Sequence, residues 1–229
     1  SFRQFLHKHG FPVPEAYPIM MNYQPEVCFF SRPWVIKPDR SSGSKGVFII
    51  GSLDDFNQRL PETLGFSPDS RGIIEEFIDG FQGTCEGIIA KGQLVLSFIL
   101  DRQTVTTPFV ATSGHCLPTL LPIHLQQKLF SILEEIIAAL EITEAIFDCD
   151  FVAANNEVYI LELSPRMGGN SISPLLYKAT GFDLIEYGVR KSCRDESSLP
   201  KKIEIRPTAV VLLGVSNKGY LCYNKGEAE

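Results

Sequence analysis

The chain has 229 residues, of which 44% are hydrophobic and 10% aromatic, so it can bury a full core as one large domain or two small ones. Its net charge of −6 argues against a basic surface for a nucleic-acid backbone, and we expect no nucleic-acid partner. The longest apolar runs, at 94–100 and 209–215, are about a third as long as a membrane-spanning helix, so no membrane association is predicted. Six scattered cysteines without a C-x-x-C pair indicate a cytoplasmic protein with neither a zinc site nor a disulfide frame.

Short strands and helices alternate along the chain. The first half predicts a helix that ends near Gly10, an extended proline-rich connector at 11–18, strands at 34–37 and 47–50, a helix near 54–60, and strands at 73–78, 84–90 and 94–101. The second half predicts a long helix from Leu125 to Leu140, a hairpin at 146–163 that turns at Asn155 and Asn156, helices at 171–181 and 182–192, a polar linker at 195–202 and a last strand.

The first group of polar residues follows the strand at 34–37. Lys37 ends that strand, and a loop rich in serine and glycine comes next. Backbone N–H groups of such a loop can contact phosphate oxygens while the lysine ammonium neutralises their charge. A flexible surface turn with a solvated lysine would give the same pattern. The loop residues are Ser41, Ser42, Gly43, Ser44, Lys45 and Gly46.

A second group lies at the end of the apolar run that starts at Ile73. Glu75 and Glu76 precede the aromatic Phe77, and a segment that leaves a sheet here can present its backbone to the edge of an adenine ring. The alternative is a solvated strand end.

The third group belongs to the predicted hairpin. Asp150 lies on its first strand and Glu162 on its second, and the loop that follows holds Arg166 and Asn170. Two carboxylates that converge from adjacent strands are costly unless a cation holds them, and hard oxygen ligands suit Mg²⁺ shared with substrate phosphates. Edge-strand acids with a salt-bridged arginine are the simpler alternative.

In this order, the three groups resemble the ATP-grasp superfamily, from Gly10 to Ser192. That family has a strand-end lysine before a glycine-rich loop, a hinge of the form E-E-[FY]-[IV], and a carboxylate followed twelve residues later by E-x-N-P-R. Gly114, His115 and Pro118 resemble the branch with amino-acid ligases and carbamoyl-phosphate-synthase-like proteins. The resemblance implies an α+β fold in which two α+β subdomains clasp the nucleotide. The expected parts are a small phosphate-loop lobe at 1–80, a large lobe with the metal site at 81–194, and at 195–229 a linker and the start of a C-terminal segment.

The resemblance also implies roles for individual residues. Arg166, Lys37 and Asn170 are the expected catalytic residues. Asp150, Glu162 and Ser164 are the expected metal ligands, with Ser164 in the place of the family's asparagine. The expected nucleotide contacts are Lys37, Ser41, Ser42, Gly43, Ser44, Lys45, Gly46, Glu75, Glu76, Phe77, Ile78, Asp79 and Glu86.

The implied activity is an ADP-forming ligase that uses ATP with Mg²⁺ or Mn²⁺. ATP phosphorylates a small-molecule carboxylate to an acyl phosphate, and an amine or a similar nucleophile then displaces phosphate. A homodimer is a possible assembly. Family members usually carry a further α/β domain before this region, so we expect the chain to be the ATP-binding part of a longer enzyme. We expect this part to turn over substrate poorly when it is alone. A non-catalytic or biotin-carboxylase-like nucleotide-binding module is the alternative.

Overall fold

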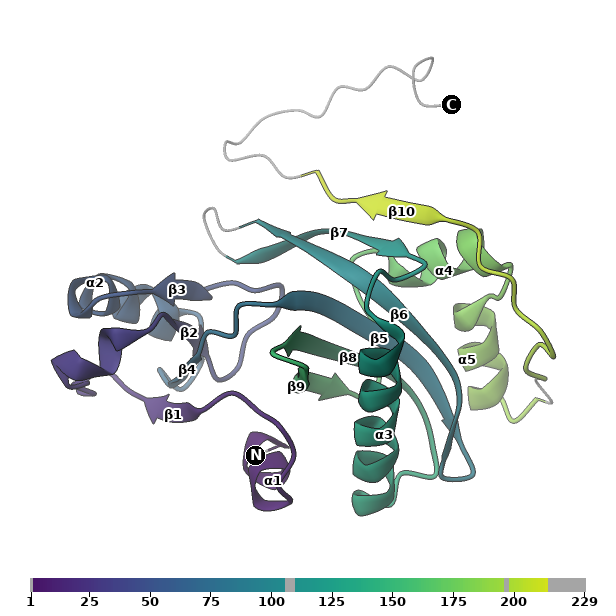
Figure 1. Cartoon of the computed structure of the whole chain (residues 1–229), viewed down its shortest axis with the longest axis horizontal. Coiled ribbons are helices and arrows are strands. Elements are labelled where there is room, and N and C mark those ends of the chain that lie inside the picture. The colour runs from purple at the N-terminus through teal and green to yellow at the C-terminus, as the bar shows by residue number, and fades with distance from the viewer. Residues whose placement is uncertain (1, 106–109, 196–197, 214–229) are drawn as a thin grey trace, which may run out of the picture.

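The computed structural model describes residues 2–105, 110–195 and 198–213, which form two antiparallel sheets with helices packed on them (Figure 1). The small sheet has the strand order β1-β4-β2-β3, and the large sheet has the order β10-β7-β6-β5-β8-β9. The small sheet contains β1 (Ala16–Ile19), β2 (Trp34–Pro38), β3 (Phe48–Ile50) and β4 (Gly72–Glu76). The large sheet contains β5 (Phe81–Ala90), β6 (Gln93–Val105), β7 (Ala111–Leu117), β8 (Glu144–Ala154), β9 (Glu157–Ser164) and β10 (Thr208–Val211). The helices are α1 (Phe2–Lys8), the 3₁₀ helix η1 (Val27–Ser31), α2 (Leu53–Gly65), α3 (Ile123–Ala139), α4 (Ile172–Thr180) and α5 (Leu184–Ser192).

Helix α2 covers the small sheet. The Ser52 hydroxyl accepts a hydrogen bond from the Asp55 N–H and so caps the first turn of the helix. Three apolar side chains then recur on one face of α2 and join the buried residues of β2, β3 and β4. These helix residues are Phe56, Leu60 and Leu64.

The large sheet is buried on both faces. On one face, α3 packs on side chains such as Phe147 and Phe151 of β8. On the other face, α4 and α5 pack on Ile88 of β5 and Leu100 of β6. Figure 1 shows α3 on one side of the curved sheet and α4 with α5 on the other. The second face carries the polar residues described below.

Helix α1 packs against the large sheet, although it precedes the small sheet in sequence. Leu6 is fully buried in the core under α3, and the Pro12 carbonyl accepts a hydrogen bond from the Ile160 N–H of β9. The chain then crosses to β1 at the edge of the small sheet (Figure 1). Residues 2–15 therefore connect the two sheets.

Most predicted elements are confirmed, with small shifts at their ends. The hairpin turn has positive φ at Asn155 (51°) and Asn156 (62°), as expected for a tight turn. The proline-rich connector was predicted to be extended, and its last part forms β1, because an edge strand tolerates Pro18. Strand β7 was not predicted. Within the described parts of the chain, no helix is long and apolar enough to span a membrane. Residues 214–229 of the predicted C-terminal segment lie outside the described residues.

Candidate functional site

One face of the large sheet brings three of the predicted carboxylates together. In the register of β5, β8 and β9, Asp150 lies opposite both Thr84 and Glu162. In the next row, Asp148 lies opposite Glu86 and Ser164. Alternate residues of a strand face the same side, so these six side chains share one face, hereafter the carboxylate face.

Asp150 is paired with a fixed arginine. Its Oδ1 accepts a hydrogen bond from the Thr84 hydroxyl at 2.7 Å, and its Oδ2 lies 2.9 Å from Nη1 of Arg102. The Arg102 Nε donates to Oγ1 of Thr112 at 2.9 Å, and the Arg102 side chain is 14% exposed. Sequence reasoning predicted a metal partner for Asp150 and missed Arg102, because the predicted strand at 94–101 ended one residue before it, whereas β6 continues to Val105.

Glu86 and Asp148 form a carboxyl pair on neighbouring strands. Glu86 is completely buried and accepts the Gly168 N–H with both oxygens, at 3.0 and 2.9 Å. Burial raises the pKa of Glu86 to about 8, and Asp148 adds to this. Burial, with the charge of Asp150, raises the pKa of Asp148 to about 6. Asp148 was not predicted as a site residue, although its position two residues before Asp150 places it on the same face.

Arg166 lies over the carboxylate face. Its Nη1 is 3.1 Å from Oδ2 of Asp148 and donates to the Met167 carbonyl at 2.9 Å, and its Nη2 is 3.8 Å from Glu162. Its side chain is 55% exposed, so the guanidinium can reach an anion from solvent. Asn170, also predicted here, is exposed and lies just before α4.

The carboxylate face fits a divalent cation that is shared with phosphates. Glu162 is exposed and accepts the Ser164 hydroxyl at 2.8 Å, while Oδ1 of Asp148 is buried with no hydrogen-bond partner in the described structure. No group of three or more His, Cys, Asp or Glu residues among the described residues could hold a metal ion alone. Mg²⁺ commonly uses one or two carboxylates, with phosphate and water oxygens completing its shell, so Glu162 with Asp148 or Asp150 would suffice.

The predicted phosphate lysine lies on the small sheet. The Lys37 Nζ is 2.6 Å from Oε1 of Glu75, and the other oxygen of Glu75 lies 2.8 Å from Nη2 of Arg3. Glu75 therefore uses its side chain to bind two cations. The neighbouring Glu76 pairs with Arg32 at 2.5 Å.

Two backbone N–H groups of the predicted adenine hinge already donate hydrogen bonds within the protein. The Glu76 N–H donates to the Glu15 carbonyl and the Phe77 N–H donates to the Pro33 carbonyl. The next residues, Ile78 and Asp79, leave the small sheet and lead to β5. Contacts of this hinge with adenine and ribose stay predictions.

The predicted phosphate loop is exposed at four of its six positions. Gly43, Ser44 and Gly46 have φ values of 66°, 57° and 75°. Gly46 is buried, and a Cβ there would lie 2.7 Å from the Phe66 ring, so a glycine is required. The tip is free of the sheet, as a loop that closes over a ligand must be. The exposed positions are Ser41, Ser42, Gly43 and Lys45.

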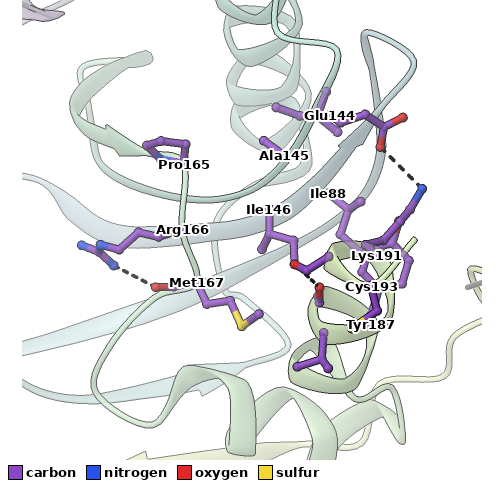
Figure 2. Close-up of a pocket in the computed structure, with 14 residues that line it drawn as sticks. Ile88, Glu144, Ala145, Ile146, Pro165, Arg166, Met167, Tyr187, Lys191 and Cys193 are labelled. Atoms are coloured by element: carbon purple, nitrogen blue, oxygen red, sulfur yellow. Dashed lines mark hydrogen bonds and ion pairs between the residues drawn. The ribbon is translucent and has the colours of Figure 1, made fainter. Parts of the chain in front are cut away.

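A cavity of about 860 Å³ lies beside Arg166 (Figure 2). Ile88 and Ile146, two residues along their strands from Glu86 and Asp148, line it from the sheet, and α5 forms the opposite wall. Figure 2 shows the Arg166 guanidinium pointing away from α5, with the Lys191–Glu144 ion pair at the far end. Gly188 lets α5 approach, since a Cβ there would lie 2.6 Å from Cε of Met167.

His115 is a further buried polar residue. It is 2% exposed, and neither ring nitrogen has a partner in the described structure. Burial, aided by the charge of Arg102, lowers its pKa to about 4, so the ring is neutral at physiological pH.

Comparison with known proteins identifies relatives. Carnosine synthase 1 of Homo sapiens is 20% identical over 222 residues, which cover 88% of this chain and 27% of that protein. A D-alanine-D-alanine ligase of Desulforudis audaxviator is 25% identical over 205 residues, which cover 82% of this chain and 66% of that protein. The chain therefore spans between about a quarter and two thirds of the length of these relatives.

A solved structure is similar in fold. It is the biotin carboxylase domain dimer of the Hydrogenobacter thermophilus 2-oxoglutarate carboxylase, in complex with MgADP, ADP and bicarbonate. The TM-score is 0.70 at 14% identity, covering 91% of this chain and 48% of that one. A family model described as the ATP-grasp domain matches residues 1–170. Because this match covers most of the chain, and the two sheets and the order of the motifs agree with it, the protein belongs to the ATP-grasp family.

Proposed function

We propose that this chain binds ATP with Mg²⁺ and joins a carboxylate to an amine through an acyl phosphate, forming ADP and phosphate. The observation that carries the proposal is the carboxylate face, where Asp148, Asp150 and Glu162 lie beneath an exposed Arg166. Lys37, on the other sheet, supplies the cation expected for the inner phosphates. The names of the relatives favour ligation of amino-acid-like substrates.

Each group has a role that follows from charge. Phosphoryl transfer needs neutralised phosphates and an in-line acceptor more than it needs a protein nucleophile. Lys37 and the loop at 41–46 hold the phosphates. Glu162 with Asp148 or Asp150 would hold Mg²⁺, which would supply positive charge to the phosphates. The acceptor carboxylate attacks the γ-phosphorus of ATP, and the bond between this phosphorus and the bridging oxygen of ADP breaks. Arg166 stabilises the acyl phosphate that forms. The amine nitrogen then attacks the acyl carbon, phosphate leaves, and the amine loses a proton.

The cavity beside Arg166 supports a substrate with an apolar part. Ile88, Ile146 and Tyr187 give it an apolar lining, and its volume lies in the range of about 300–1,000 Å³ typical of small-molecule pockets. Because the Arg166 guanidinium points away from α5 (Figure 2), a carboxylate held there would extend an apolar group back past the arginine side chain to enter this cavity. We therefore propose carboxylic acids with an apolar side chain as the substrate class.

The test traps the acyl phosphate. The chain is incubated with Mg-ATP, hydroxylamine and a panel of carboxylic acids, and hydroxamate and ADP are measured. We expect hydroxamate with apolar acids, and an Arg166→Gln variant should lose about 100-fold in rate while it still binds ATP. Arg190→Gln, which removes an exposed arginine of α5, is the matched control and should keep its rate. If ADP forms but none of the acids gives hydroxamate, the proposed ligase activity is wrong.

One observation favours the alternative of a nucleotide-binding module without chemistry. Asp150 is already neutralised by Arg102, and Ser164 is a weaker metal ligand than asparagine. In that case ATP affinity would not depend on Mg²⁺, and no ADP would form with any acid and amine.

A further inference from the structure

We infer that Arg3 is a positioning residue that keeps the positive charge of Lys37 available for phosphate. The inference rests on the proposed function, because it concerns the same nucleotide site. It assigns a role to α1, which carries none of the predicted motifs.

The geometry is a three-membered ion-pair chain. Glu75 bridges the two cations, with one oxygen 2.6 Å from the Lys37 Nζ and the other 2.8 Å from the Arg3 Nη2. The Glu75 side chain is 6% exposed, Arg3 is 16% exposed and Lys37 is 26% exposed. Lys37 is thus the most open member and the one that a ligand can reach.

The charges explain why two cations are needed. A buried glutamate that meets Lys37 alone forms a neutral pair, which attracts a polyphosphate weakly. With Arg3 present, the three side chains carry one net positive charge. Glu75 can hold Lys37 in place while the group as a whole still attracts phosphate.

Arg3 is held in place by two backbone carbonyl groups of the large sheet. Its Nη1 donates to the Ile160 carbonyl and its Nη2 to the Leu161 carbonyl of β9, both at 3.3 Å. Glu162 of the carboxylate face follows directly in sequence. The guanidinium therefore joins the lysine of the small sheet to the carboxylate strand of the large sheet, and a lysine at position 3 could not bond all three acceptors in the same way.

The experiment compares ATP with adenosine, which has the same base and sugar but no phosphate. Dissociation constants for both are measured by calorimetry at low salt for the whole chain and its variants. Arg3→Gln should weaken ATP binding about tenfold and leave adenosine binding within about twofold. Arg3→Lys should keep most of the ATP affinity, because it keeps the charge.

Two further variants separate the charge from a general effect on folding. The double variant Arg3→Gln with Glu75→Gln restores one net positive charge at Lys37, so ATP affinity should recover toward that of the original chain. Arg32→Gln removes the arginine paired with the adjacent Glu76 and should change ATP affinity less than threefold. Thermal unfolding shows which variants are folded.

The outcomes distinguish the inference from the proposed function. If the original chain binds no ATP, the proposed function fails and the inference fails with it. If the chain binds ATP but Arg3→Gln binds it equally well, or binds ATP and adenosine more weakly by the same factor, the inference alone is overturned. Failure of the double variant to recover would also overturn it.

Discussion

At the scale of single residues, Glu86 and Asp148 are two carboxyl groups whose pKa is raised by burial. Glu86 receives only the Gly168 N–H as a hydrogen-bond donor, and Asp148 has one oxygen with no partner in the described structure. The loop at Gly168 is packed on both, since a Cβ there would lie 2.7 Å from Glu86 and 2.9 Å from Asp148. A proton on one of them relieves the repulsion between them.

This pair predicts that the ligand-free protein becomes less stable as the pH rises. The pKa of Glu86 is about 8 in the folded chain and 4.5 in the unfolded chain, so between these values the native state holds a proton that the unfolded state has lost. The free energy of unfolding should therefore decrease from pH 5 to pH 8, by on the order of 4 kcal/mol. Glu86→Gln, neutral at every pH, should remove most of this decrease in urea unfolding measured without Mg²⁺. Glu134→Gln, on the exposed side of α3, should leave the slope unchanged, and an equal slope in both variants would contradict the assignment.

At the scale of elements, α5 forms one wall of the cavity and leaves part of that wall open to solvent. Val189 lines the cavity and is 57% exposed, whereas Ile185, one turn earlier and 49% exposed, does not line it. Val189→Trp should fill the cavity without disturbing the core. We expect the KM for the best apolar acid to rise at least tenfold while ATP affinity is unchanged. Ile185→Trp is the matched control and should have neither effect, and equal KM values for both variants would exclude the cavity as the site of the apolar group.

The sequence predicts elements well where they are periodic and less well at the edges of the sheets. Helix α3 was predicted because its apolar residues recur at helical spacing. The β8–β9 hairpin was predicted because its turn has two asparagines. Strand β1 was missed because its pairing partner, β4, lies more than fifty residues away. The alternation of β7 is weak, with a glycine and a histidine in its buried positions. Asp150 and Glu162, the expected metal ligands, were predicted to converge from adjacent strands and lie opposite each other.

At the scale of the whole molecule, the partners of the charged site residues were not predicted, because they lie on strands and helices that are distant in sequence. Lys37 was predicted to face phosphate, but its ion pair with Glu75 depends on the pairing of β2 with β4, and the contact of Arg3 with Glu75 depends on where α1 packs. Likewise, the pairing of Asp150 with Arg102 was not predicted, because Arg102 lies beyond the predicted end of its strand and Asp150 lies two strands away in the sheet. Motif order indicates which residues meet a ligand, whereas the fold decides which charges are already balanced before the ligand arrives.

Closure of the two lobes on a nucleotide should be visible as protection of the loop at 41–46. Arg40 directly precedes this loop, Lys45 lies within it, and both are exposed, so trypsin can cut after either. If the loop closes over phosphates, Mg-ATP at saturating concentration should slow cleavage at both sites by at least about tenfold, because a closed loop must open again before it is cut. Lys91, at the exposed β5–β6 turn, is the internal control and should be cut at the same rate with and without nucleotide. Adenosine, which lacks phosphates, should give no protection, and equal protection by adenosine and ATP would mean that this loop does not contact the phosphates.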